Sequence, residues 1–163
     1  MIRKKGMTYV EKLMLEKVNT ILSQSPGGEE FFNILDNSIL NDMSDLISLI
    51  IDMVPSHYTL ILTGKFGKHV SQRLGTEYPY RNHILCNGGI RKGTYPEILS
   101  HSEVCNKNAV MIDDSFYSGK TYETIKAFLS DQGISLNRCI VMYDGSKERH
   151  QHVNSLFRYW NFF

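Results

Sequence analysis

Cysteine is scarce in this sequence, and its spacing excludes two kinds of site. The chain of 163 residues contains three cysteines, Cys86, Cys105 and Cys139. No two of them have the C-x-x-C spacing that a structural zinc site or a redox motif needs. An odd number without paired spacing also argues against a disulfide framework and favours a reducing compartment. We therefore expect a cytoplasmic protein.

An excess of charge of one sign is also missing. Lys and Arg number 18 against 17 Asp and Glu, which leaves a formal net charge of +1, so we expect no nucleic-acid-binding surface. No apolar run is long enough to span a membrane, and the charged N-terminus lacks the apolar core of a signal peptide. Because no further metal-ligating residue clusters with His150 and His152, we expect them to be surface residues rather than metal ligands.

What is present fits a single domain over residues 1–163. Hydrophobic residues make up 42% of the chain, which at this length is enough to bury a core. Helical spacing predicts a helical N-terminal region over residues 1–56, followed by a core over 57–145 and a C-terminal strand with an aromatic tail over 146–163. The predicted strands cover residues 58–63, 82–86, 109–112, 138–143 and 153–159, and the predicted helices cover 10–22, 31–35, 43–54 and 121–132.

The most informative segment is AVMIDDSFYSGKT, residues 109–121. Its four apolar residues predict a strand buried on both faces, with Asp113 and Asp114 at the carboxyl end and a helix beginning at Thr121. A helix N-terminus offers unpaired N–H groups and a positive dipole to an anion, and Gly119 allows close approach of the backbone. Carboxylates beside such a phosphate site need another target, such as the hydroxyls of a sugar, a cation or a cationic transition state.

The Gly-Lys-Thr triplet at residues 119–121 also suggests a nucleotide-binding P-loop, but the spacing is wrong. That loop needs a glycine five residues before Gly119, and Asp114 stands there. A second possible P-loop, at residues 64–69, also fails, because the position where the motif needs its first glycine is occupied by Leu62. The strand could instead be the magnesium-holding acidic strand of an ATPase, but no P-loop accompanies it.

AVMIDDSFYSGKT closely resembles the motif with which type I phosphoribosyltransferases bind phosphoribosyl pyrophosphate (PRPP). The resemblance implies an α/β fold, with an open, mainly parallel central sheet flanked by helices. It implies that Asp113 and Asp114 bind the ribose hydroxyls, and that residues 117–121 hold the 5-phosphate. It also implies Mg²⁺ as cofactor, PRPP and a nucleobase or nucleotide as partners, and a homodimer.

The resemblance also implies further site residues. A pyrophosphate loop would follow the strand at 58–63 through Lys65, Phe66 and Gly67, although an ordinary turn with solvated lysines also fits that segment. Arg91 and Lys92 would act in catalysis from a mobile loop, for which a solvated surface hairpin is an equal alternative. The remaining candidates for substrate binding are Ser115, Tyr117, Ser118, Gly119, Lys120, Thr121, Tyr143 and Asp144.

Two departures from the family pattern leave two functions open. Tyr117 stands where members that use 6-oxopurines carry an aspartate, and a phenol cannot replace that acid near neutral pH. The basic loop around Arg91 is also shorter than in many active members. The sequence therefore predicts either a magnesium-dependent phosphoribosyltransferase or a non-catalytic sensor of PRPP or nucleotides.

Overall fold

The computed structural model describes residues 44–88, 95–102 and 106–158. Several predictions fall outside these residues: the helices at 10–22 and 31–35, the catalytic candidates Arg91 and Lys92, and the aromatic tail. Cys105 lies outside them as well. Within the described ranges, no helix is long and apolar enough to cross a membrane.

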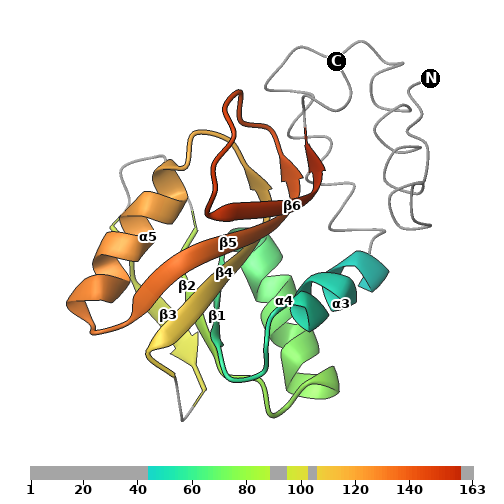
Figure 1. The fold of residues 1–163 in the computed structure, drawn as a ribbon. Coiled ribbons are helices and arrows are strands. Elements are labelled where there is room, and N and C mark those ends of the chain that lie inside the picture. The colour runs from blue at the N-terminus through green and yellow to red at the C-terminus, as the bar shows by residue number, and fades with distance from the viewer. Residues whose placement is uncertain (1–43, 89–94, 103–105, 159–163) are drawn as a thin grey trace.

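A six-stranded sheet forms the centre of the fold, in the order β3-β2-β1-β4-β5-β6 (Figure 1). Neighbouring strands pair parallel except β2 and β3, which pair antiparallel at one edge. The predicted α/β class with an open, mainly parallel sheet is therefore confirmed. The strands are β1 (Thr59–Thr63), β2 (His83–Cys86), β3 (Ile98–His101), β4 (Asn108–Phe116), β5 (Ser135–Asp144) and β6 (Val153–Arg158).

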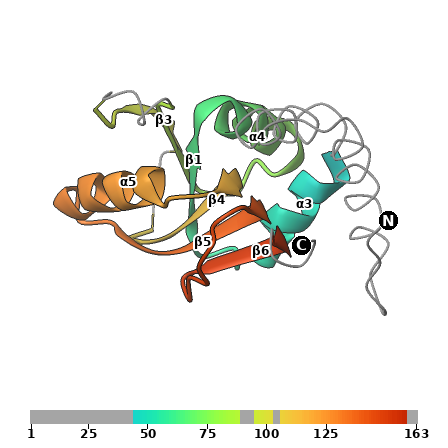
Figure 2. The same cartoon turned by 90° about the horizontal axis from the view of Figure 1, so that it is seen from above.

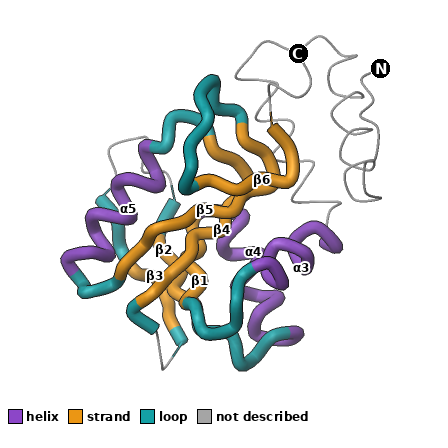
Figure 3. Tube along the Cα trace, in the orientation of Figure 1, coloured by secondary structure: helices purple, strands orange, loops and turns teal. Residues whose placement is uncertain are grey.

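Helices cover both faces of this sheet (Figures 2 and 3). Helix α5 (Lys120–Asp131) packs on one face, and α3 (Ser44–Met53) and α4 (Gly64–Glu77) lie on the other. All five residues of β1 are buried, as expected for a parallel strand covered on both sides. The core under α5 contains residues of five strands and of α5 itself: Ile61, Ile84, Cys86, Ala109, Met111, Phe116, Tyr122, Ile125, Leu129, Leu136, Cys139, Val141 and Val153.

Three elements differ from the sequence prediction. Strand β4 continues through both aspartates to Phe116, because Ser115 and Phe116 stay paired with Tyr143 and Asp144 of β5. Helix α4 begins directly at Gly64, so the segment predicted as a turn is the first turn of a helix. Strand β3 was not predicted, because four residues with only two apolar side chains carry too short a pattern.

Candidate functional site

The strand order places a topological switch point between β1 and β4, and we call this position, at the carboxyl ends of the two strands, the crevice. From β1 the chain moves outward to β2, whereas from β4 it moves in the opposite direction to β5 and β6. Such a switch point, at the carboxyl ends of parallel strands, is where open α/β sheets bind ligands. Helix α4 follows β1 and helix α5 follows β4, so two helix N-termini flank this crevice. We call the two connections the β1–α4 junction and the β4–α5 junction.

The β4–α5 junction has a left-handed residue at its centre. Gly119 is the N-cap of α5 with φ 78°, and no side chain caps the helix there. A Cβ at this position would lie 2.9 Å from Cζ of Phe116, so both the backbone and the ring beneath require glycine. The backbone N–H of Lys120, the first residue of α5, donates to Ser118 Oγ over 3.4 Å, and a helix leaves the next amides of its first turn without an intrahelical partner. The hydroxyl of Ser118 and the ammonium of Lys120 are exposed beside them.

Both aspartates of the β4–α5 junction are half-buried. The backbone N–H of Asp114 donates to Asp113 Oδ1 over 2.9 Å, and Ser115 Oγ donates to Asp114 Oδ1 over 3.3 Å. These contacts orient the two carboxylates. The prediction that the aspartates follow the end of the strand is wrong in detail, because both lie within β4 and are held by its pairing with β5.

The β1–α4 junction presents mainly backbone. Thr63 precedes α4 in an extended conformation without capping it, because its hydroxyl donates to the carbonyl of Asn87 over 2.9 Å. Lys65 is exposed, whereas Phe66 and Gly67 are buried. A Cβ on Gly67 would lie 2.9 Å from the carbonyl carbon of Leu62. Of the three predicted pyrophosphate residues, only Lys65 has an exposed side chain.

The segment after β2 is the base of a hairpin. Asn87 Nδ2 donates to the carbonyl of Tyr95 over 2.8 Å, and the N–H of Glu97 donates to Asn87 Oδ1 over 2.7 Å. A Cβ on Gly88 would lie 2.6 Å from Cα of Gly64, so this hairpin starts in contact with the first residue of α4. The catalytic role of Arg91 and Lys92, which lie outside the described residues, stays a prediction.

Tyr117, Tyr143 and Asp144 pack the loops together. A Cβ on Gly145 would lie 2.4 Å from Cε1 of Tyr117, so the Tyr117 ring lies against the backbone after β5. Tyr143 is fully buried and Asp144 is 2% exposed. The Asp144 carboxylate accepts hydrogen bonds from the N–H and the hydroxyl of Ser146. These contacts assign Tyr143 and Asp144 to loop packing, in place of the direct base contact that the sequence predicted.

Two histidines that we expected at the surface belong to an aromatic cluster beneath the β4–α5 junction. His152 stacks on Tyr122, with ring centroids 4.7 Å apart, and His150 meets Phe116 edge-on at 5.2 Å. Burial lowers the pKa of His152, and the neighbouring His150 lowers it further. Both histidines are nevertheless partly exposed, so they lie at the surface while packing against Phe116 and Tyr122. The cluster joins residues that are distant in sequence, so a local pattern could not predict it. The one signal was that the two histidines stand two residues apart, a spacing that places side chains on the same face of a strand.

The described cysteines are buried free thiols. Cys86 and Cys139 form no disulfide, and burial raises the pKa of Cys86 to about 11. Burial also raises the pKa of Cys139, with further contributions from Asp113 and Asp144. Because the nucleophilic form of cysteine is the thiolate, neither of these two side chains is activated for covalent catalysis near neutral pH.

No protein-family model and no curated protein sequence matches this chain. Solved structures do match. The orotate phosphoribosyltransferase of Aeropyrum pernix superposes with a TM-score of 0.53 at 14% identity, over 73% of this chain and 72% of that one. The orotate phosphoribosyltransferase of Francisella tularensis gives 0.51 at 14% identity, over 74% and 70%. A phosphoribosyltransferase from Corynebacterium diphtheriae gives 0.50 at 11% identity, over 72% and 73%.

These similarities identify the fold of the chain. The chain has an open α/β sheet with a switch point between β1 and β4. More narrowly, this is the phosphoribosyltransferase fold, shared over about three quarters of the chain. The fold that the PRPP-motif resemblance implied is thereby confirmed.

Proposed function

We propose that this protein is a phosphoribosyltransferase that transfers ribose 5-phosphate from PRPP to a nitrogenous base and releases pyrophosphate. One observation carries the proposal: two helix N-termini without side-chain caps flank the half-buried pair Asp113 and Asp114 at the switch point of the sheet. PRPP has a matching shape, with a phosphate at one end, a pyrophosphate at the other and a diol between them. The fold shared with solved phosphoribosyltransferases supports it.

In the proposed complex each junction binds one end of PRPP. The amides that begin α5, with Ser118 and Thr121, hold the 5-phosphate, because unpaired N–H groups and the helix dipole favour an anion. The amides that begin α4 hold the pyrophosphate together with Lys65, whose ammonium is exposed there. Asp113 and Asp114 accept hydrogen bonds from the ribose hydroxyls, which are charge-assisted and therefore strong.

The proposed reaction is a substitution at C1 of the ribose. The bond from C1 to the pyrophosphate oxygen breaks and its electron pair leaves with pyrophosphate, while a ring nitrogen of the base forms the new bond to C1. Positive charge develops on the sugar, and the carboxylates of Asp113 and Asp114 stabilise it. Lys65 and the α4 amides stabilise the departing charge, so catalysis rests on electrostatics and positioning, without a protein nucleophile.

The residues at the crevice fit a magnesium ion bound with PRPP. Mg²⁺ prefers hard oxygen ligands and usually binds through one or two carboxylates plus substrate phosphates. Asp113 and Asp114 offer half-buried carboxylates of that kind. A bound magnesium ion would neutralise charge on the pyrophosphate. The proposed contacts of the helix amides and of Lys65 with PRPP do not require the metal.

A second function, the non-catalytic sensor, is favoured by the loop after β5. Tyr143 and Asp144, the two predicted base contacts, are both buried, so neither is open to a base. A protein with a sugar-phosphate site but without a base site would bind PRPP or a nucleotide without turnover. Base recognition by an enzyme would then have to come from other residues.

One experiment separates these functions. PRPP binding is measured by calorimetry with Mg²⁺, followed by pyrophosphate release across a panel of purines, pyrimidines and other nitrogenous bases. Release with at least one base, lost in the double variant Asp113→Asn/Asp114→Asn and kept in the exposed control Asp131→Asn, supports the enzyme. PRPP binding without release for any base supports the sensor. Absence of binding to PRPP and to every nucleotide monophosphate would contradict both.

A further inference from the structure

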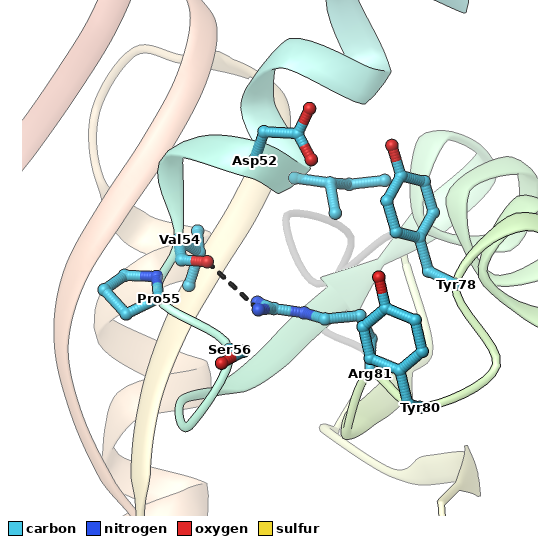
Figure 4. A pocket seen from close by; sticks show the side chains of 8 residues that line it. Asp52, Val54, Pro55, Ser56, Tyr78, Tyr80 and Arg81 are labelled. Carbon is cyan, nitrogen blue, oxygen red and sulfur yellow. Dashed lines mark hydrogen bonds between the residues drawn. The ribbon is translucent and has the colours of Figure 1, made fainter.

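A cavity lies beside Arg81, on the side of the sheet where the strands begin (Figure 4). It has a volume of about 260 Å³ and is lined by the end of α3, the segment before β1 and the segment between α4 and β2. These segments precede β1 and β2, so the cavity is at the amino ends of the strands. The residues that matter for its chemistry are Asp52, Val54, Pro55, Tyr78, Tyr80 and Arg81.

Arg81 is the buried cation of this cavity. Its side chain is 5% exposed, and Nη1 donates to the carbonyl of Val54 over 3.0 Å. Nε and Nη2 are buried and have no hydrogen-bond partner among the residues that the structure describes. These two nitrogens form one edge of the guanidinium plane, where two N–H groups point in the same direction. That edge can bind both oxygens of a carboxylate or phosphate at once.

An unpaired edge of a buried guanidinium is costly. Each buried donor left without a partner loses the hydrogen bonds that it made to water. Burial lowers the pKa of Arg81, but a guanidinium remains charged in a protein. The bond to Val54 fixes one end of the group and leaves Nε and Nη2 buried without a partner among the described residues. An anion in the cavity would satisfy both remaining donors and neutralise the charge.

The surroundings favour an anion with a single charge. Asp52 is exposed, and its carboxylate is close enough to raise the pKa of Arg81, although within the described ranges the two form no ion pair. A doubly charged phosphate would be repelled by Asp52 more strongly than a carboxylate would. Val54 and Pro55 add apolar lining, and Tyr78 adds an aromatic ring. The volume of about 260 Å³ is below the usual range for drug-sized ligands, roughly 300–1,000 Å³.

We propose that this cavity binds a small monocarboxylic acid with an apolar or aromatic body, whose carboxylate pairs with Nε and Nη2 of Arg81. The apolar body lies against Val54 and Pro55, in the view of Figure 4 across from Tyr78 and Tyr80. This site is separate from the crevice between β1 and β4, and it does not depend on the proposed phosphoribosyl transfer. The two sites lie at opposite ends of α4, which begins at Gly64 and is followed directly by Tyr78.

The test uses the full chain and benzoate as the probe, followed by NMR. We expect a saturable shift of the Arg81 Nε–H signal on addition of benzoate. Neutral benzamide and inorganic phosphate should each bind at least about tenfold more weakly, because benzamide lacks the charge and phosphate is repelled by Asp52. Arg81→Lys keeps a positive charge but loses the paired edge, so benzoate affinity should fall about tenfold. Arg138→Lys, at an exposed arginine, is the matched control and should change nothing.

A second variant keeps the proposal testable if Arg81→Lys does not fold. Asp52→Asn changes an exposed residue and should tighten benzoate binding about threefold, because a repulsive charge is removed. The same change should narrow the difference between benzoate and phosphate. Absence of a saturable shift with benzoate would overturn the proposal. Stronger binding of phosphate than of benzoate, or benzoate affinity unchanged in Asp52→Asn, would overturn it as well.

Discussion

The β1–α4 and β4–α5 junctions lie at the same edge of the sheet, yet they are built differently. At the first, α4 begins immediately after β1, and Phe66 and Gly67 turn into the core. At the second, a loop with left-handed Gly119 separates β4 from α5. The first junction therefore offers amides and one lysine, whereas the second adds the carboxylates of β4. Under the proposed function, the first junction would need only helix amides and a lysine to bind an anion, whereas the second would also need the acids to bind the sugar.

The largest expected effect on turnover comes from replacing Asp113 or Asp114. Asp113→Asn and Asp114→Asn should each lower turnover about 100-fold, because removing one preorganised electrostatic group from a transition state typically costs that much. Asparagine keeps an acceptor oxygen for the local hydrogen bonds, so folding should be unaffected. Steady-state pyrophosphate release checks this, with Asp131→Asn as control. Unchanged turnover in both variants would place the chemistry elsewhere.

A pair of glycines in α4 tests the tight packing of the β1–α4 junction. Gly67→Ala would place a Cβ 2.9 Å from the backbone of Leu62 and should lower the free energy of unfolding by about 2 kcal/mol through overpacking. Gly75→Ala meets nothing within 4 Å and should raise it by about 0.5 kcal/mol, since alanine favours the helix. Urea denaturation measures both. Equal effects would mean that α4 does not pack on β1 as described.

A second pair of glycines tests the β4–α5 junction. Gly119 and Gly133 have nearly the same left-handed φ, 78° and 77°, but a Cβ meets the Phe116 ring only at Gly119. Gly133→Ala should cost about 1 kcal/mol from backbone strain alone. Gly119→Ala should cost about 1 kcal/mol more, because the ring must shift. Thermal or urea unfolding measures the difference, and a cost no larger than that of Gly133→Ala would remove the role assigned to Phe116.

Lys65 is the exposed lysine proposed to bind pyrophosphate at the β1–α4 junction. Lys65→Met should weaken pyrophosphate binding about fivefold at low salt, and the loss should shrink at high salt because exposed charges are screened. Stability should not change, since the side chain is exposed. Lys107→Met, at an exposed lysine before β4, is the control. Calorimetry with pyrophosphate at two salt concentrations tests this, and a salt-independent loss would point to a structural effect.

The contrast between the junctions also explains what the sequence could predict. The apolar run of β4, the stripe of α5 and the motif around Asp113 are local patterns, and each produced the observed element near its predicted place. The start of α4 at Gly64 and the extension of β4 to Phe116 depend on contacts with β2 and β5, which no local pattern records. The same holds for Arg81, whose environment is assembled from three separate segments.

The smallest expected effect is a pH dependence confined to the β4–α5 junction. Burial and His150 lower the pKa of His152 from 6.5, so the folded protein favours its neutral form. The unfolded chain then binds this proton more readily, and the stability that His152 contributes is complete above pH 6.5 and is lost as the pH falls. Glu123 opposes this shift and Lys126 adds to it. Both side chains come from α5, the helix that also carries the stacked ring of Tyr122.

Replacing the ring isolates this dependence. His152→Phe keeps an aromatic partner for Tyr122 but removes the titrating group, so the free energy of unfolding should change less between about pH 7.5 and pH 5 than in the native sequence. His101→Phe, at an exposed position on β3, should leave that slope unchanged. Urea unfolding at both pH values measures the slopes. If the stability of His152→Phe changed with pH as much as that of the native sequence, the acid sensitivity would belong to another group. The β4–α5 junction would then differ from the β1–α4 junction only in its carboxylates and its loop.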